Sequence, residues 1–204
     1  MYALVEDNNI TQIITNPKTM VIGDVRYPAK IFQLWSQSEL NAIGIYEVIT
    51  DSSNFKDEKW YINTNESYAF ADNQVTRSWG TATPKAHADS NAVDDDGNNI
   101  LDDDGNQVIN YGLKTQLIKT IKQQASGLLA PTDWYVVKAS EVSDYSVPTN
   151  IATYRASVRT KSNEMETLIT NASDTPALET LYTYTEQEDG SVTRPLGELP
   201  TLEI

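Results

Sequence analysis

Short apolar runs, separated by residues that tolerate turn geometry, dominate the first 80 residues of the chain. The runs YALVE and TQIIT flank Asp7-Asn8-Asn9, and MVI and VRY flank Gly23-Asp24, so each pair predicts a small hairpin. Three later runs, KWYIN, SYAFA and QVTRSW, alternate in polarity and are rich in aromatic and β-branched residues, which favours strands. Residues 1–80 are therefore expected to form a small, mostly antiparallel domain.

A helical signal interrupts these strands in FQLWSQSELNAIGIYEVI. Ser36 and Glu39 have the spacing of a capping box, and Leu40 and Ile43 form a short apolar face. Gly44 suits a left-handed C-cap. The pattern predicts a short helix that leads into a strand, which makes this domain α+β.

Residues 81–92 lack apolar periodicity and are expected to be a linker. Residues 93–112 then contain DDDGN twice, at a spacing of eight. Asp-Gly and Asn between β-branched residues specify tight turns, which predicts a β-hairpin meander. Calcium bound by the clustered carboxylates is the alternative, although neither loop has the spacing or the final Glu of an EF-hand.

From Leu113 onward the apolar period becomes that of an α-helix. The residues on its apolar face are Leu113, Leu117, Ile118, Ile121, Ala125, Leu128 and Leu129. Thr132 is expected to be the N-cap of a short helix, and a second long helix is predicted from about Pro148 to about Ala172. Residues 113–184 are therefore expected to form a helical domain built on a helical hairpin. Residues 185–204 are expected to form an acidic C-terminal tail or strand.

The turn between these helices is rich in aromatic residues and arginines. Five residues are candidates for binding a partner, namely Arg155, Arg159, Trp134, Tyr135 and Tyr154. Aromatic residues at helical spacing usually serve packing, so the three aromatics are expected to fill the junction between two helices. The arginines would then lie on a solvated face, which leaves them as the better interface candidates.

The chain is acidic, with 15 Lys and Arg against 29 Asp and Glu and a formal charge of −14. This charge opposes contact with nucleic acid and with anionic membrane surfaces, so neither is an expected partner. No apolar run approaches the roughly 20 residues of a membrane span. The N-terminal sequence also lacks the features of a signal peptide, which predicts synthesis in the cytoplasm.

Charge is unevenly distributed between segments. Residues 91–110 hold six Asp and no basic residue, and residues 173–204 hold seven acids and only Arg194. Between them, residues 111–172 hold seven Lys and Arg against five Asp and Glu. A mildly basic helical part therefore lies between two acidic flanks, which intramolecular or partner contacts could use.

No catalytic constellation is visible in the sequence. The chain has no cysteine, and His87 is its one histidine, so a histidine-based triad and a typical zinc site are excluded. Phosphate-binding, dinucleotide-binding and nucleophile-elbow motifs are also absent. We expect no catalytic residue, no metal site and no cofactor, and we expect the protein not to be an enzyme.

The segments PTDWYVVK and VPTNIATYRASVR resemble the C-terminal module of small tailed-bacteriophage proteins identified as tail fibre assembly proteins or tail assembly chaperones. The resemblance covers residues 113–172. The matching positions are Leu129, Thr132, Asp133, Trp134, Lys138, Pro148, Tyr154, Arg155 and Arg159. The usual Pro-Trp-Pro ending is replaced by RPLGELPTLEI, which keeps prolines but has no tryptophan.

This resemblance implies a non-enzymatic bacteriophage tail protein that acts through contacts with phage tail or fibre proteins. Contacts with copies of itself, in a homo-oligomer, are a further option. The first expectation is a component resident in the virion, as part of a tail fibre, a baseplate or a tail attachment structure. The alternative is a transient tail fibre assembly chaperone that stays in the host cytoplasm and is absent from the mature particle.

Overall fold

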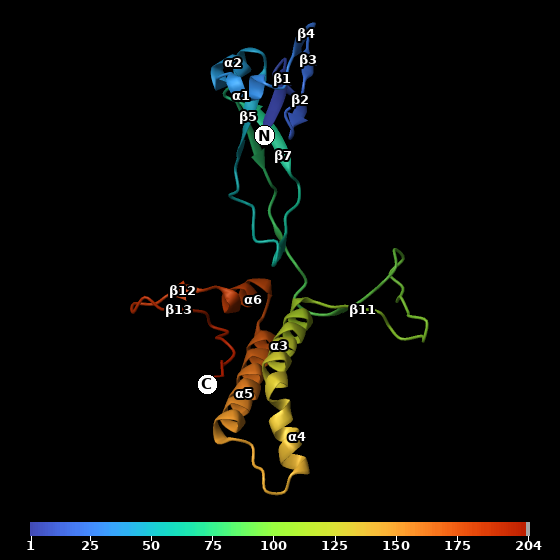
Figure 1. Cartoon of the computed structure of the whole chain (residues 1–204). Coiled ribbons are helices and arrows are strands. Elements are labelled where there is room, and N and C mark those ends of the chain that lie inside the picture. Colours follow the sequence, from blue (N-terminus) through green and yellow to red (C-terminus); the bar gives the residue numbers. More distant parts are fainter. Residues whose placement is uncertain (203–204) are drawn as a thin grey trace. The chain divides into compact units, whose positions relative to one another are not determined.

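The structure is a computed structural model that describes residues 1–202 (Figure 1). The chain divides into two units, Met1–Thr83 and Pro84–Ile204. A mostly antiparallel sheet forms the first unit and long helices dominate the second, so the α+β prediction is confirmed. The boundary between the units falls inside the segment that the sequence predicted to be a linker.

The first unit is built on a five-stranded sheet in the order β2-β1-β5-β8-β7. Its strands are β1 (Tyr2–Glu6), β2 (Asn9–Ile14), β5 (Ile45–Thr50), β7 (Ser67–Ala71) and β8 (Gln74–Ser78). All neighbouring pairs are antiparallel except β5 and β8, which are parallel. Asp7 and Asn8 turn between β1 and β2 with positive φ, a conformation that Asp and Asn tolerate better than most residues.

Smaller elements complete this unit. They are β3 (Met20–Ile22), β4 (Val25–Tyr27), α1 (Ile31–Leu34), α2 (Gln37–Ala42) and β6 (Tyr61–Ile62), and the two-residue strand β9 (Thr83–Pro84) spans the boundary between the units. The hairpin predicted around Gly23 is present, with β3 paired to β4. The capping box at α2 is also confirmed, because the Ser36 amide donates to the Glu39 carboxylate at 2.7 Å and the Glu39 amide donates to the Ser36 hydroxyl at 3.3 Å.

Both faces of the sheet carry apolar clusters. On one face, Leu4, Ile14 and Ile45 pack with residues of the β3–β4 hairpin, α1 and α2. On the other face, Ala3, Val5, Val48 and Val75 form a second apolar cluster. The alternation of strand side chains explains how successive residues of β1 enter both clusters.

The second unit contains the long helices (Figure 1). They are α3 (Leu113–Leu129), the 3₁₀ turn η1 (Ala130–Thr132), α4 (Asp133–Glu141), α5 (Thr149–Asn171) and α6 (Thr175–Tyr182). Leu113, Leu117, Ile121 and Ala125 are buried on α3, as the helical period predicted. On α5 the polar Ser162 is also buried, although it interrupts the apolar stripe in the sequence.

Residues 81–92 are not a free connector. The backbone amides of Leu113 and Lys114, at the start of α3, donate to Ala86 and His87 at 2.9 and 3.0 Å. The first amides of a helix have no partner within the helix, so this segment supplies the missing acceptors. Two short strands follow, β10 (Ser90–Asn91) and β11 (Ile109–Asn110), which pair with each other.

The two DDDGN repeats form the turns that the sequence predicted, but with little regular strand between them. Two isolated bridges, Val93 with Asn99 and Leu101 with Gln107, close the two loops. Gly97 and Gly105 have φ of 83° and 81°, a left-handed conformation that glycine adopts at low cost.

The described part of the C-terminal segment folds back on the helical unit. It contains a hairpin of β12 (Thr185–Glu186) and β13 (Val192–Thr193). Leu196 is fully buried, and Leu199 and Leu202 pack against a cluster that includes Tyr154. Apolar side chains therefore anchor residues 196–202 on the helices. These residues form neither a free tail nor a regular strand. Residues 203 and 204 of the predicted tail lie outside the described part.

Candidate protein-docking site

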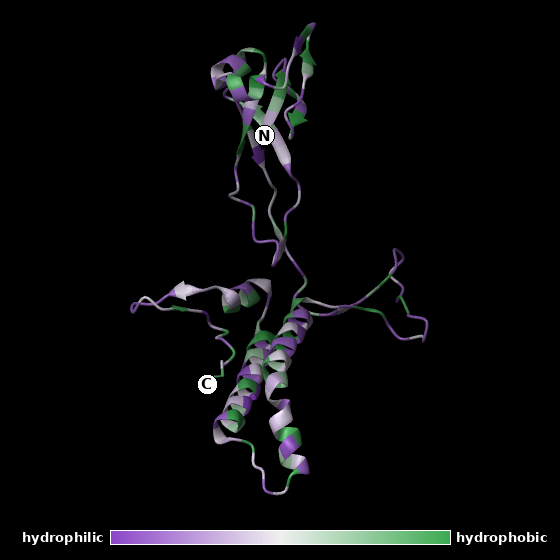
Figure 2. Cartoon of the chain, in the orientation of Figure 1, coloured by the Kyte–Doolittle hydropathy of each residue, from purple (hydrophilic) through white to green (hydrophobic). Residues whose placement is uncertain are grey.

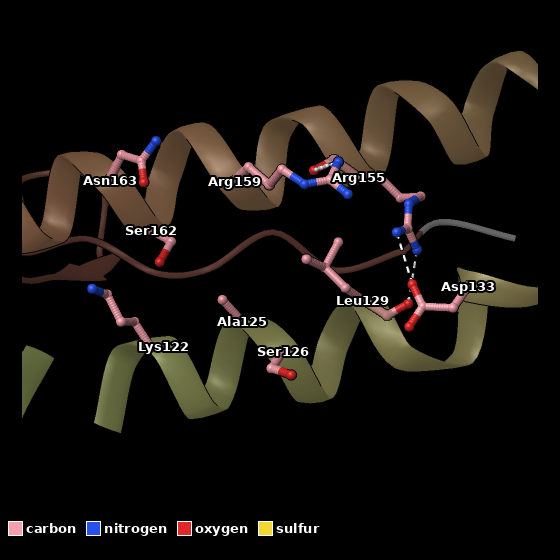
Figure 3. Close-up of a pocket in the computed structure, with 9 residues that line it drawn as sticks. All are labelled: Lys122, Ala125, Ser126, Leu129, Asp133, Arg155, Arg159, Ser162 and Asn163. Atoms are coloured by element: carbon pink, nitrogen blue, oxygen red, sulfur yellow. Dashed lines mark hydrogen bonds and ion pairs between the residues drawn. The ribbon is translucent and has the colours of Figure 1, made fainter. Parts of the chain in front are cut away.

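The candidate site is the corner at which α3 ends, α4 begins and α5 passes beside them (Figure 3). Each long helix leaves its last carbonyl groups without a partner in the helix. At the end of α3, residues from α5 supply donors for two of these carbonyls. The Tyr154 hydroxyl donates to the Leu128 carbonyl at 3.4 Å, and the Arg155 guanidinium donates to the Leu129 carbonyl at 2.9 Å.

Arg155 joins three parts of this corner. Its Nη1 donates to the Leu129 carbonyl and to the Thr132 hydroxyl, while its Nη2 lies 2.7 Å from the Asp133 carboxylate. Thr132 in turn donates to the Leu129 carbonyl at 2.7 Å. A planar guanidinium with several fixed donors suits such a set of acceptors. We call Arg155, Thr132 and Asp133 the corner lock.

Electrostatics also favour this arrangement. The C-terminal end of a helix carries partial negative charge, so the Arg155 cation is favourable beside the last turn of α3. Asp133 lies in the first turn of α4, where a carboxylate is favourable. Thr132 precedes α4 as predicted, but its side chain makes no cap to that helix.

An open groove of about 450 Å³ lies beside the corner lock, between α3 and α5. We call it the basic groove, because Lys122, Arg155 and Arg159 line it and Asp133 is the one acid among the lining residues. The Lys122 ammonium pairs with Glu166 at 3.1 Å. Within residues 1–202, Arg159 has no carboxylate partner, and its guanidinium only donates to the Arg155 carbonyl at 3.4 Å. Arg159 is thus an exposed charge directed along the groove (Figure 3).

The short helix α4 has no buried residue, although it includes hydrophobic residues (Figure 2). Trp134 is 52 % exposed and Val137 is 53 % exposed, and their spacing of three places them on one face. The Lys138 ammonium lies 5.7 Å from the centre of the Trp134 ring and 4.3 Å from that of Tyr145. We call Trp134 and Val137 the α4 apolar face.

The structure corrects two expectations about the candidate residues. Trp134 was expected in the helix junction but is exposed, because α4 turns Tyr135 and Ala139 inward and Trp134 outward. Arg155 was expected on a solvated face but is buried, because the unpaired carbonyls at the end of α3 need its donors. Tyr154 is buried as expected, and Tyr135 is half-buried with its ring 4.0 Å from that of Trp134.

Sequence reasoning placed four of the candidates, Trp134, Tyr135, Tyr154 and Arg155, in one region, and the structure brings them to the corner. It missed Lys122, which lies on α3, and Thr132 as an acceptor for Arg155. Lys122 is off the apolar stripe of α3, but nothing local shows that it faces the arginines of α5. The pairing of α3 with α5 decides that.

The first aspartate of each DDDGN loop, Asp94 or Asp102, is occupied by its own turn. Asp94 accepts hydrogen bonds from the amides of Asp96 and Asn98, and Asp102 does so from Asp104 and Asn106. The Asn98 amide lowers the pKa of the Asp94 carboxyl, and the Asn106 amide lowers that of Asp102. Within residues 1–202, no group of three or more histidine, cysteine or acidic residues is arranged to hold a metal ion.

Comparisons with known proteins add no family. No protein-family model matches the chain, and no significant match exists to a curated protein or a solved structure. Among the helices in residues 1–202, none has the length and apolar character needed to cross a membrane.

Proposed function

We propose that this chain is a non-enzymatic bacteriophage tail protein that acts through protein contacts and resides in the virion, as a tail fibre, baseplate or tail attachment component. The resemblance of the Thr-Asp-Trp to Tyr-Arg segment suggests the phage tail. One structural observation carries the mode of action: α4 exposes Trp134 and Val137 and buries none of its own residues. A helix with an uncovered apolar face is typical of an interaction site.

The corner lock supports this proposal. Arg155, Thr132 and Asp133 fix the start of α4 relative to α5, so the α4 apolar face is held in position before any partner arrives. A preorganised surface loses less conformational entropy on binding. Tryptophan is also among the residues that most often dominate the binding energy of an interface.

Mass spectrometry of purified particles tests the proposal. A resident component is expected in particles at a constant ratio to other tail proteins. Presence only in complexes with unassembled fibre subunits would favour the transient chaperone, and absence from both would refute a tail role.

A variant locates the contact. Trp134→Ala protein, supplied to phage that lack the wild-type chain, is expected to fold but not to enter particles. Tyr184→Ala is the matched control, because Tyr184 is an aromatic residue that is also 52 % exposed but lies away from α4. Normal incorporation of Trp134→Ala would exclude the α4 apolar face as the contact.

A further inference from the structure

Residues 90–110, which we call the acidic arm, branch off at the start of α3 (Figure 1). Their base is clamped in place. The Asp89 carboxylate accepts hydrogen bonds from the Gly112 amide and the Thr115 hydroxyl, each at 2.8 Å. A side chain at Gly112 would meet the Ala88 carbonyl, since a Cβ there would be 2.4 Å from its oxygen. The arm therefore leaves the helical unit in a defined direction.

Three backbone hydrogen bonds form a closed ring inside the arm. Ala92 donates to Val108, Val108 donates to Ile100, and Ile100 donates to Ala92, at 2.8 to 2.9 Å. The Gln107 amide adds bonds to the carbonyls of Ala92 and Val108. The ring joins both DDDGN loops to the base, so the arm is an ordered structure with its own hydrogen bonds.

The arm makes no polar contact with the rest of the chain beyond its base. Among residues 1–202, all hydrogen bonds of residues 90–110 stay within the arm. Its surface still combines apolar side chains with free acids. Val93, Ile100 and Leu101 are exposed. The exposed acids without a side-chain partner in the described residues are Asp95, Asp96, Asp103 and Asp104.

The basic groove has the complementary character. Two of its three lining cations are paired within the chain, Arg155 with Asp133 and Lys122 with Glu166, whereas the exposed Arg159 has no carboxylate partner in residues 1–202. The clamp at Asp89 directs the arm away from the α3–α5 pair of its own chain (Figure 1). Arm and groove of one molecule are therefore held apart, while the same two surfaces on different molecules are free to meet.

We infer that the acidic arm of one copy docks against the basic groove of a second copy of this chain. The loop carboxylates pair with Arg159, and the exposed apolar residues of the arm cover the α3–α5 surface beside it. Two different surfaces meet in this contact, so it is heterologous, and repetition around a rotation axis closes a ring of subunits. This inference does not depend on the phage role proposed above.

Sedimentation velocity of the full-length chain over a range of concentrations tests the contact. The wild type is expected to self-associate, and raising the salt from about 0.05 M to about 0.5 M is expected to weaken association because salt screens exposed charges. An arm variant, Asp95→Lys with Asp103→Lys, and a groove variant, Arg159→Glu, should each raise the dissociation constant about tenfold or more.

The decisive sample is an equimolar mixture of the arm variant with the groove variant. In this mixture the reversed arm of one protein matches the reversed groove of the other, so association between the two variants is expected to recover. Glu186→Lys with Glu188→Lys is the matched control, since it reverses two exposed acids outside the arm and should leave association unchanged.

Three outcomes would overturn the inference. A wild type that stays monomeric at all concentrations would show that the arm serves another partner or its own chain. Association that is unaffected by the arm and groove variants would place the contact elsewhere. Two variants that fail to recover in the mixture, while circular dichroism shows both to be folded, would disprove the pairing of arm with groove.

Discussion

Replacement of Arg155 by methionine isolates the contribution of the corner lock. Methionine keeps an unbranched apolar stem of similar length but has no donors. The change removes the hydrogen bonds to Leu129 and Thr132 and the ion pair with Asp133. Arg159→Met is the matched control, because it is the same substitution one turn further along α5 at an exposed position without a carboxylate partner in residues 1–202.

The size of the loss follows from the burial of each partner. The bonds to the Leu129 carbonyl and the Thr132 hydroxyl are buried or nearly so, and together contribute about 2 kcal/mol. The Asp133 side chain is 59 % exposed and is rehydrated when the pair is lost, so this ion pair contributes at most about 1 kcal/mol. We expect Arg155→Met to lower the free energy of unfolding by about 3 kcal/mol.

Thermal unfolding followed by the helical circular dichroism band measures this loss, since the long helices all lie in the second unit. For a unit of about 120 residues, 3 kcal/mol corresponds to a fall of about 10 °C in the midpoint. Arg159→Met should change the free energy of unfolding by no more than about 0.5 kcal/mol. Arg155→Lys should recover only part of the loss, because an ammonium cannot reach all three acceptors at once.

Equal losses in the Arg155 and Arg159 variants would refute the corner lock. Full recovery by Arg155→Lys would show that charge alone matters, and that the geometry of the guanidinium does not.

Three further variants or conditions have expected outcomes. Trp134→Ala should lower the free energy of unfolding by less than about 1 kcal/mol, because the indole is half exposed; a loss of 3 kcal/mol or more in a denaturant titration would show that it belongs to the core. Gly127→Ala should stabilise α3 by about 0.5 to 1 kcal/mol, since the added Cβ meets nothing within 4 Å. Gly112→Ala should destabilise the second unit, because the added Cβ would meet the Ala88 carbonyl. A higher melting midpoint for Gly112→Ala than for Gly127→Ala would contradict this. The folded pKa values of Asp94 and Asp102 lie below the unfolded value of about 3.9. Their turns are therefore fully stabilised above about pH 4 and lose that stability as pH falls through the folded pKa. An NMR titration of the loop amides with a midpoint at or above about 3.9 would contradict this.

Local sequence rules predicted much of the first unit and the limits of the helices. Asp7, Asn8 and Gly23 adopt the positive φ that their residue types favour, and Ser36 and Glu39 form the capping box. Such features depend on residues a few positions apart, so the sequence contains their cause. The same holds for the DDDGN turns and for the start of α5 after Pro148.

The limits of sequence reasoning appear at the candidate site. Helical spacing assigned Trp134 to the core and Arg155 to the surface, and the structure reverses both. Spacing gives the angle of a residue around its helix but does not identify the element that covers that face. Arg155 is buried because the end of α3, more than 20 residues earlier, presents unpaired carbonyls at that point.

The sequence by itself determined the α+β composition, the turns, the helix caps and the uneven charge, because each arises from short-range preferences or from residue counts. Only the tertiary structure decided which arginine is structural, which tryptophan is exposed and where the basic groove lies. Those properties depend on the approach of α5 to the end of α3. There the Leu129 carbonyl, a threonine and an aspartate bind the guanidinium of Arg155, whereas Arg159 has no carboxylate partner in residues 1–202.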